Sequence, residues 1–243
     1  WGQVALAGSL LHVFNHCLFK SLLFFGAGSV LHATGTRDMS RLGGLWRTMP
    51  WTAALFAIGA AAVSGLPPLN GFVSEWAIYQ GLLKAVAQKG ETFGVLPAVI
   101  VLAGTGALAL GAFAKASAIV FLGAPRGKTS GHAAECGPAM RAAMVVPAAV
   151  MLCVGIMPGV FLNAVQGCIG AWAPQWAASA LPIPARAIGG AHTVLACFLI
   201  AAAVIALRKV RAGGIRRGPT WDCGYAAPTA HMQYTGGSFA GIV

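Results

Sequence analysis

The stretch that decides the fold reads LAGSLLHVFNHCLFKSLLFFGAGSVLHA and covers residues 6–33. It is long enough to cross a membrane as a helix, which takes about 20 mostly apolar residues, although it carries three ionisable side chains in its interior. Four long stretches without Asp, Glu, Lys or Arg follow it, with 27, 23, 44 and 21 residues. The sequence therefore predicts an all-α, polytopic membrane protein with about five transmembrane helices.

The composition excludes several other classes of protein. Hydrophobic residues make up 58% of the chain and charged residues 9%, whereas soluble domains carry about 25% charged residues. The net charge of +11 lies in short clusters between apolar runs, which is typical of membrane proteins. We therefore expect neither a soluble enzyme nor a disordered tail, and no nucleic acid among the partners.

The apolar stretches predict where the chain crosses the membrane. The predicted spans are 6–33, 50–83 (broken near 65–71), 95–123, 143–165 and 188–207. They form a membrane domain over 1–207 and leave a basic tail over 208–243. The second half of the 44-residue stretch holds two Trp and three Pro over 172–184, which favours an interfacial connection over another span.

The basic residues predict the orientation. Loops 34–49 and 124–142 and the tail hold eleven Lys and Arg, whereas the other two loops hold three. Positive charge gathers on the cytoplasmic side of membrane proteins. We therefore expect a multi-pass protein of the cell's inner (plasma) membrane, with these two loops and the tail in the cytoplasm.

His12, His16 and Lys20 recur at every fourth residue. On a helix they stand in one stripe, each about 6 Å above the last. Ionisable groups at membrane depth face the protein interior or a hydrated cavity, and imidazoles titrate near neutral pH. The stripe predicts a proton relay. The alternative is two His bonded to neighbouring helices and a Lys20 that reaches the membrane surface.

The second span contains a predicted helix break. Pro67 and Pro68 remove two backbone donors, and Gly65 and Gly71 flank them with permissive backbone. Broken helices at membrane depth mark ion sites in transporters. Glu75 follows early in the second half-helix, where the helix dipole stabilises a carboxylate. We predict Glu75 as a proton-carrying group, with a charge at the membrane surface as the alternative.

Lys115 is a further candidate. Ten uncharged residues separate it from Arg126, which places it about 15 Å from the helix end. A functional role and a side chain that reaches the surface are both open. The six cysteines form no C-x-x-C pair, and the chain has no nucleotide, haem or iron–sulfur motif. We therefore expect no metal site, no cofactor and no redox chemistry in this chain itself.

Five stretches resemble a known family. Those at His12–Val30 and Asn70–Glu75 resemble the antiporter-like membrane subunits of respiratory complex I and related enzymes. Those at His32–Asp38, Trp221–Tyr225 and Met232–Thr235 are similar to the large membrane subunit of formate-hydrogenlyase and hydrogenase-4 type complexes.

The resemblance implies two inverted repeats of five helices, each with a broken helix and a central Lys, in a fold of 14 or more helices. His12, His16 and Lys20 match its second central relay, and Glu75 matches its charged exit position. The chain begins with Trp1, and we expect the C-terminal half of a longer subunit. The implied partners are the upstream half, other membrane subunits, lipid, and a peripheral hydrogenase or dehydrogenase arm.

The predicted function is therefore proton translocation by a non-catalytic subunit of a redox-driven complex, through a relay of His, Lys and Glu. A sodium/proton antiporter subunit is one alternative. A membrane anchor that docks a hydrogenase and conducts nothing is the other, which the stripe and the broken helix disfavour.

Overall fold

The computed structural model describes residues 1–90, 92–126, 132–176, 179–213 and 233–238. These residues form helices and connections without a strand. The helices are α1 (Gly2–Thr34), η1 (Met39–Arg41), η2 (Leu45–Arg47), α2 (Pro50–Val63), α3 (Asn70–Lys89), α4 (Thr92–Phe121), α6 (Pro138–Ile156), α7 (Pro158–Trp172), η3 (Pro174–Trp176) and α8 (Ala185–Arg211). Among them, α1, α4, α6 and α8 are long and apolar enough to cross a membrane, so the all-helical membrane fold is confirmed.

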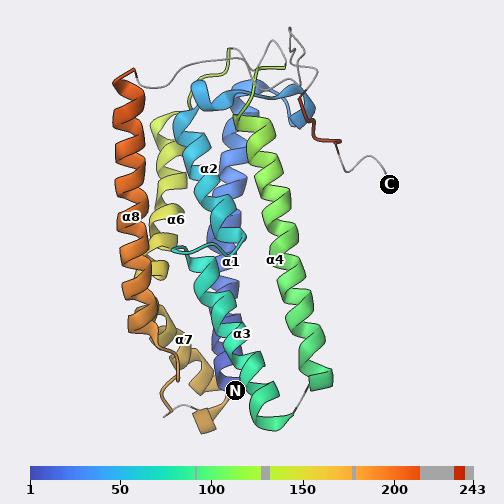
Figure 1. The fold of residues 1–243 in the computed structure, drawn as a ribbon, viewed down its shortest axis with the longest axis vertical. Coiled ribbons are helices and arrows are strands. Elements are labelled where there is room, and N and C mark those ends of the chain that lie inside the picture. The colour runs from blue at the N-terminus through green and yellow to red at the C-terminus, as the bar shows by residue number, and fades with distance from the viewer. Residues whose placement is uncertain (91, 127–131, 177–178, 214–232, 239–243) are drawn as a thin grey trace.

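Helix α1 runs through the centre of the bundle (Figure 1), and α3 packs directly on its backbone. A Cβ added to Gly8 would lie 2.7 Å from the backbone N of Ile78, and one added to Gly81 would lie 2.5 Å from the backbone N of Ala5. Two helices approach this closely only where glycine removes the side chain between them. Glycine therefore brings α3 against the helix that carries the ionisable stripe.

The predicted break in the second span is present. Helix α2 ends at Val63 and α3 begins at Asn70, and the two halves follow each other down the bundle (Figure 1). Gly65 adopts a φ of +65°, which only glycine tolerates readily. Gly71 lies inside the first turn of α3, where an added Cβ would stand 1.9 Å from the carbonyl oxygen of Ala62. This glycine lets the two half-helices meet.

The predicted span 143–165 is wrong as a single helix. Helix α6 ends at Ile156, Met157 leaves the helical conformation, and Pro158 starts α7. Proline has no N–H and clashes with the preceding turn, so it begins a new helix. Hydropathy missed this break because the residues around it remain apolar. Two helices are therefore interrupted within the part of the chain that the structure describes, where the sequence predicted one.

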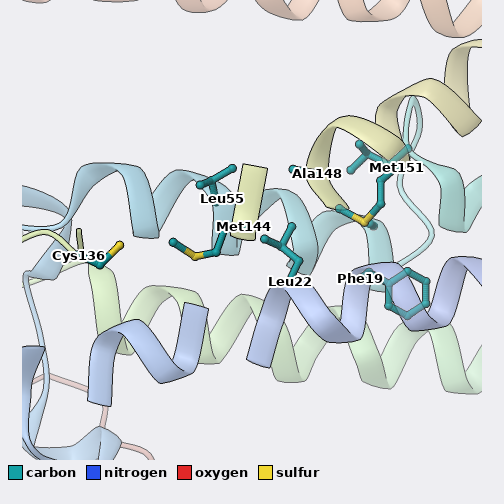
Figure 2. Close-up of a cluster of buried hydrophobic side chains, with 9 residues drawn as sticks. Phe19, Leu22, Leu55, Cys136, Met144, Ala148 and Met151 are labelled. Atoms are coloured by element: carbon teal, nitrogen blue, oxygen red, sulfur yellow. The ribbon is translucent and has the colours of Figure 1, made fainter. Parts of the chain in front are cut away.

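The core lies between α1, α2 and α6. Figure 2 shows side chains that meet there from the three helices and from the connection before α6, namely Phe19, Leu22, Leu55, Cys136, Met144, Ala148 and Met151. The outer helices are different. Only 6% of the most apolar stretch of α4 and 11% of that of α8 is buried. Apolar surface of this extent faces lipid or other membrane subunits.

The loops with most positive charge share one end of the bundle. Residues 35–49, 122–126 and 132–137 and the end of α8 lie at the same end of the bundle, opposite the N-terminus (Figure 1). Helix α6 begins at Pro138, so the second of these loops ends at Gly137, earlier than the predicted 142. Arg216 and Arg217 of the tail lie outside the described residues. The arrangement agrees with the predicted orientation, whereas the cytoplasmic assignment itself stays a prediction.

Glu135 caps α2 from a distant part of the chain. Its carboxylate accepts hydrogen bonds from the Trp51 backbone N–H at 2.7 Å and the Thr52 hydroxyl at 2.6 Å. These groups lie in the first turn of α2, whose N–H groups have no partner inside the helix. Burial by itself would raise the pKa of Glu135, but these and further backbone hydrogen bonds hold it below its ordinary value.

We expect Glu135→Gln to lower the free energy of unfolding by about 1 kcal/mol at neutral pH, because a charged helix cap is lost. The lowered pKa means that the cap stabilises the folded state above the unfolded carboxyl's pKa. This stabilisation disappears as pH falls through the lower, folded-state pKa. Thermal unfolding in detergent across acidic pH measures the effect.

Asp38→Asn is the matched control, because Asp38 caps only the three-residue η1, through the Ser40 backbone N–H. It should cost less than about 0.5 kcal/mol, as changes at exposed sites usually do. Equal losses for the two variants, or a Glu135→Gln loss independent of pH, would contradict the capping role.

Candidate functional site

The stripe occupies the central part of α1 in the register that its spacing predicts. The rings of His12 and His16 have centroids 6.4 Å apart. Phe19, which is buried, packs edge-on against both, with centroids 6.1 and 5.3 Å from theirs. His12 and Lys20 are half-buried and His16 is exposed. Within this chain the stripe thus opens to one side and is not enclosed.

Hydrogen bonds join the stripe to α3. His12 Nδ1 lies 3.1 Å from the Ser74 hydroxyl. Asn15 Nδ2 donates to the same hydroxyl at 3.0 Å and to the backbone carbonyl of Asn70 at 2.8 Å. Asn15, Asn70 and Ser74 are fully buried. The sequence analysis did not single out these three residues, although Asn15 directly precedes His16 and Ser74 directly precedes Glu75.

Lys20 points towards α4. Its ammonium lies 5.8 Å from the ring centroid of Phe113, within the range of a cation–π contact. Lys115 is two residues beyond Phe113, on nearly the opposite side of α4, and does not join the stripe. Its ammonium donates to the backbone carbonyl of Ser238. Helix α4 ends at Phe121, short of the predicted 123, so Lys115 lies nearer the helix end than the sequence predicted. A role for Lys115 in the relay stays a prediction.

Glu75 lies at the break between α2 and α3. Its Oε2 is 2.6 Å from the position of a Cβ added to Gly65, and 3.9 Å from one added to Gly106 of α4. Glu75 stands in the second turn of α3. The helix dipole acts mainly on the first turn, so the expected dipole stabilisation is weaker than the sequence implied. The environment of the Glu75 carboxylate is instead defined by its contact with Gly65 in the helix break.

The structure brings the stripe together but does not bond it to Glu75. Ser74, which contacts His12, and Glu75 are neighbours on α3 and point about 100° apart. Lys20 and Glu75 nevertheless both face the same helix, α4. Their contacts there, Phe113 and Gly106, are two turns apart, or about 10 Å along the helix.

Comparison with known proteins shows what this chain is similar to. Residues 1–101 match the family model described as "NADH:quinone oxidoreductase/Mrp antiporter, TM". The chain is 37% identical over 233 residues to formate hydrogenlyase subunit 3 of Escherichia coli, covering 91% of this chain and 36% of that protein. It is 35% identical over 235 residues to hydrogenase-4 component B of the same organism, covering 91% and 35%. It thus spans about a third of these relatives' length.

A solved structure supports the fold. The membrane-bound sulfane sulfur reductase, an archaeal respiratory membrane complex, contains a chain that matches with a TM-score of 0.68 and 22% identity. The match covers 94% of this chain and 36% of that one. The resemblance that the motifs predicted, to antiporter-like membrane subunits of the complex I and hydrogenase type, is confirmed.

Proposed function

We propose that this chain, an antiporter-like membrane subunit by its relatives, moves protons across the membrane through His12, His16, Lys20 and Glu75. One observation carries the proposal. Three ionisable side chains stand in register at the centre of a membrane-spanning helix, where such groups are costly and are kept for ion movement. Lys20 and Glu75 then face the same helix, α4.

Water completes the proposed path. The 6.4 Å between the two imidazole rings suits a bridging water better than a direct hydrogen bond. The side-chain oxygen of Asn15 and both polar side-chain atoms of Asn70 are buried and have no hydrogen-bond partner among the described residues. Buried polar atoms are ordinarily satisfied by protein or water. A proton then passes from His12 to His16 and Lys20, and along α4 to Glu75.

The energy for this movement comes from a partner. The relatives named above are subunits of formate hydrogenlyase and hydrogenase-4, and we assign this chain to a redox-driven complex of that type. The chain itself is non-catalytic in this proposal. Its exposed α4 and α8 faces contact lipid and other membrane subunits. The end that holds residues 35–49, 122–126 and 132–137 faces the cytoplasm and the peripheral redox arm.

A sodium/proton antiporter subunit is the second candidate. The matching family model includes Mrp antiporters in its description, so the family alone does not decide the coupling ion. The two functions differ in their requirements. Ion movement that depends on sodium and needs no redox substrate would favour the antiporter, whereas proton uptake that follows redox turnover favours the first proposal.

We expect Lys20→Gln to lower proton uptake per redox turnover by about tenfold. Glutamine cannot carry the proton, but it still binds the bridging water, so the loss is smaller than the factor of about a hundred or more that a proton-transfer group contributes. The measurement uses membrane vesicles that hold the complete complex, with redox turnover and subunit recovery followed in parallel. Lys115→Gln is the matched control and should leave uptake within about twofold, since Lys115 bonds to the Ser238 carbonyl and does not join the stripe. Similar losses in the two variants would contradict a relay specific to the stripe.

A further inference from the structure

The two helix breaks lie directly against each other. A Cβ added to Gly155, the second-last residue of α6, would stand 1.9 Å from the backbone carbonyl oxygen of Pro68. Pro68 belongs to the segment between α2 and α3. Backbone therefore touches backbone at this junction, without an intervening side chain. The position of one break fixes the position of the other.

Helix α8 closes this junction from the outside. A Cβ added to Gly189 would lie 2.4 Å from the carbonyl oxygen of Ile156, so α8 rests on the end of α6. One turn further along α8, His192 is buried, with 4% of its surface exposed. Its Nδ1 lies 2.8 Å from the carbonyl oxygen of Gly155. Because a carbonyl only accepts, Nδ1 carries the proton and donates it.

This hydrogen bond replaces one that the break removes. In a continuous helix the carbonyl of Gly155 would accept from the N–H of Gly159, four residues on. Helix α6 ends before that residue, at Ile156. A backbone carbonyl without a partner is costly at membrane depth. His192 supplies the missing donor from another helix.

His192 also contacts the first broken helix. Its ring lies 5.3 Å from the ring of Phe72, centroid to centroid, in an edge-to-face arrangement. Phe72 is in the first turn of α3, three residues before Glu75. One side chain of α8 thus contacts both breaks, and the helix that carries Glu75.

We propose that His192 is a positioning residue, which holds the α6–α7 break against the α2–α3 break and thereby fixes the place of the Glu75 carboxylate. That the Glu75 carboxylate matters for proton movement rests on the proposed function. That His192 fixes the position of this carboxylate does not depend on the proposed function, and it can be measured separately.

The test compares two replacements of His192 in the intact complex. Asparagine keeps a donor at the position of Nδ1, whereas leucine of similar size has none. The readout is the rate at which a hydrophobic carbodiimide labels Glu75, followed by mass spectrometry of the peptide. Thr193→Val is the matched control on α8, because its hydroxyl bonds only within the helix, to Gly189.

In the His192→Leu variant we expect the carbodiimide to label Glu75 about three- to tenfold faster than in wild type, as the loss of one buried hydrogen bond would allow. Proton uptake per turnover should be reduced in the same variant. His192→Asn should restore the wild-type labelling rate, and Thr193→Val should not change it. Unchanged labelling in His192→Leu would overturn the proposal. If His192→Leu does not assemble, His192→Gln takes its place, because its longer side chain displaces the donor by one methylene. Glu75 must then be labelled faster in His192→Gln than in wild type, and an equal rate overturns the proposal.

This outcome is separate from that of the proposed function. Undiminished proton uptake in a Glu75→Gln protein would defeat the relay. Faster labelling of Glu75 in His192→Leu would still establish that His192 positions the carboxylate.

Discussion

A Glu75→Gln protein is expected to assemble normally and to lose about 99% of its coupled proton uptake, since a proton-transfer group contributes about a hundredfold or more. Glutamine has the size of glutamate and fits the same place against Gly65 and Gly106. It cannot take up and release a proton. The expected loss exceeds that for Lys20→Gln, because no second carboxylate among the described residues shares this position between the break and α4.

The experiment follows proton uptake by vesicles during redox turnover, normalised to the turnover itself and to subunit recovery. Glu135→Gln is the matched control, because it makes the same chemical change at a helix cap outside the relay. Its uptake per turnover should equal that of wild type. If Glu75→Gln retains full uptake, the chain does not conduct through this carboxylate, and a non-conducting anchor becomes the better interpretation.

Gly71→Ala is expected to prevent folding of the subunit or to cost it about 3 kcal/mol or more, the upper range for overpacked sites. The added methyl would stand 1.9 Å from the carbonyl oxygen of Ala62 and 3.1 Å from its carbon. Neither atom can rotate away, because both belong to the backbone of α2. The half-helices α2 and α3 would have to separate, which would also displace Glu75.

Gly28→Ala is the matched control, since Gly28 lies within α1 and a Cβ there meets nothing within 4 Å. Alanine is favoured over glycine inside a helix by about 0.5–1 kcal/mol, so this variant should be as stable as wild type or slightly more stable. Thermal unfolding and yield of the detergent-solubilised protein separate the two variants. Equal stability would show that the helix break tolerates a side chain at Gly71.

The sequence predicted what depends on local pattern. The apolar stretches located the spans, the spacing of His12, His16 and Lys20 located the stripe, and the prolines near Gly65 located the first break. Each of these follows from composition or from helical geometry within one segment. Pro158 carried the same kind of signal for the second break, but the apolar residues around it hid the interruption.

Contacts between distant segments were not predictable in this way. Asn15 meets Ser74 and Asn70 only because glycines bring α1 and α3 together, and no periodicity reports that approach. Lys115 shows the same limit, since its partner, the carbonyl of Ser238, is more than a hundred residues away. The surroundings of Lys115 depend on which distant segment of the chain packs beside it, and residue spacing within α4 does not reveal that.

The meeting of the two breaks has a mechanical consequence. The break between α2 and α3 lies at the same level of the bundle as the break between α6 and α7 (Figure 1). At this level, two of the helical paths through the bundle therefore lack continuous backbone hydrogen bonds. Bending stiffness is lowest where the ladder of hydrogen bonds is cut. Among the described helices, α1, α4 and α8 pass this level without interruption and carry a load across it. We therefore expect force applied at one membrane face to bend the bundle more readily at this level, close to Glu75, than above or below it.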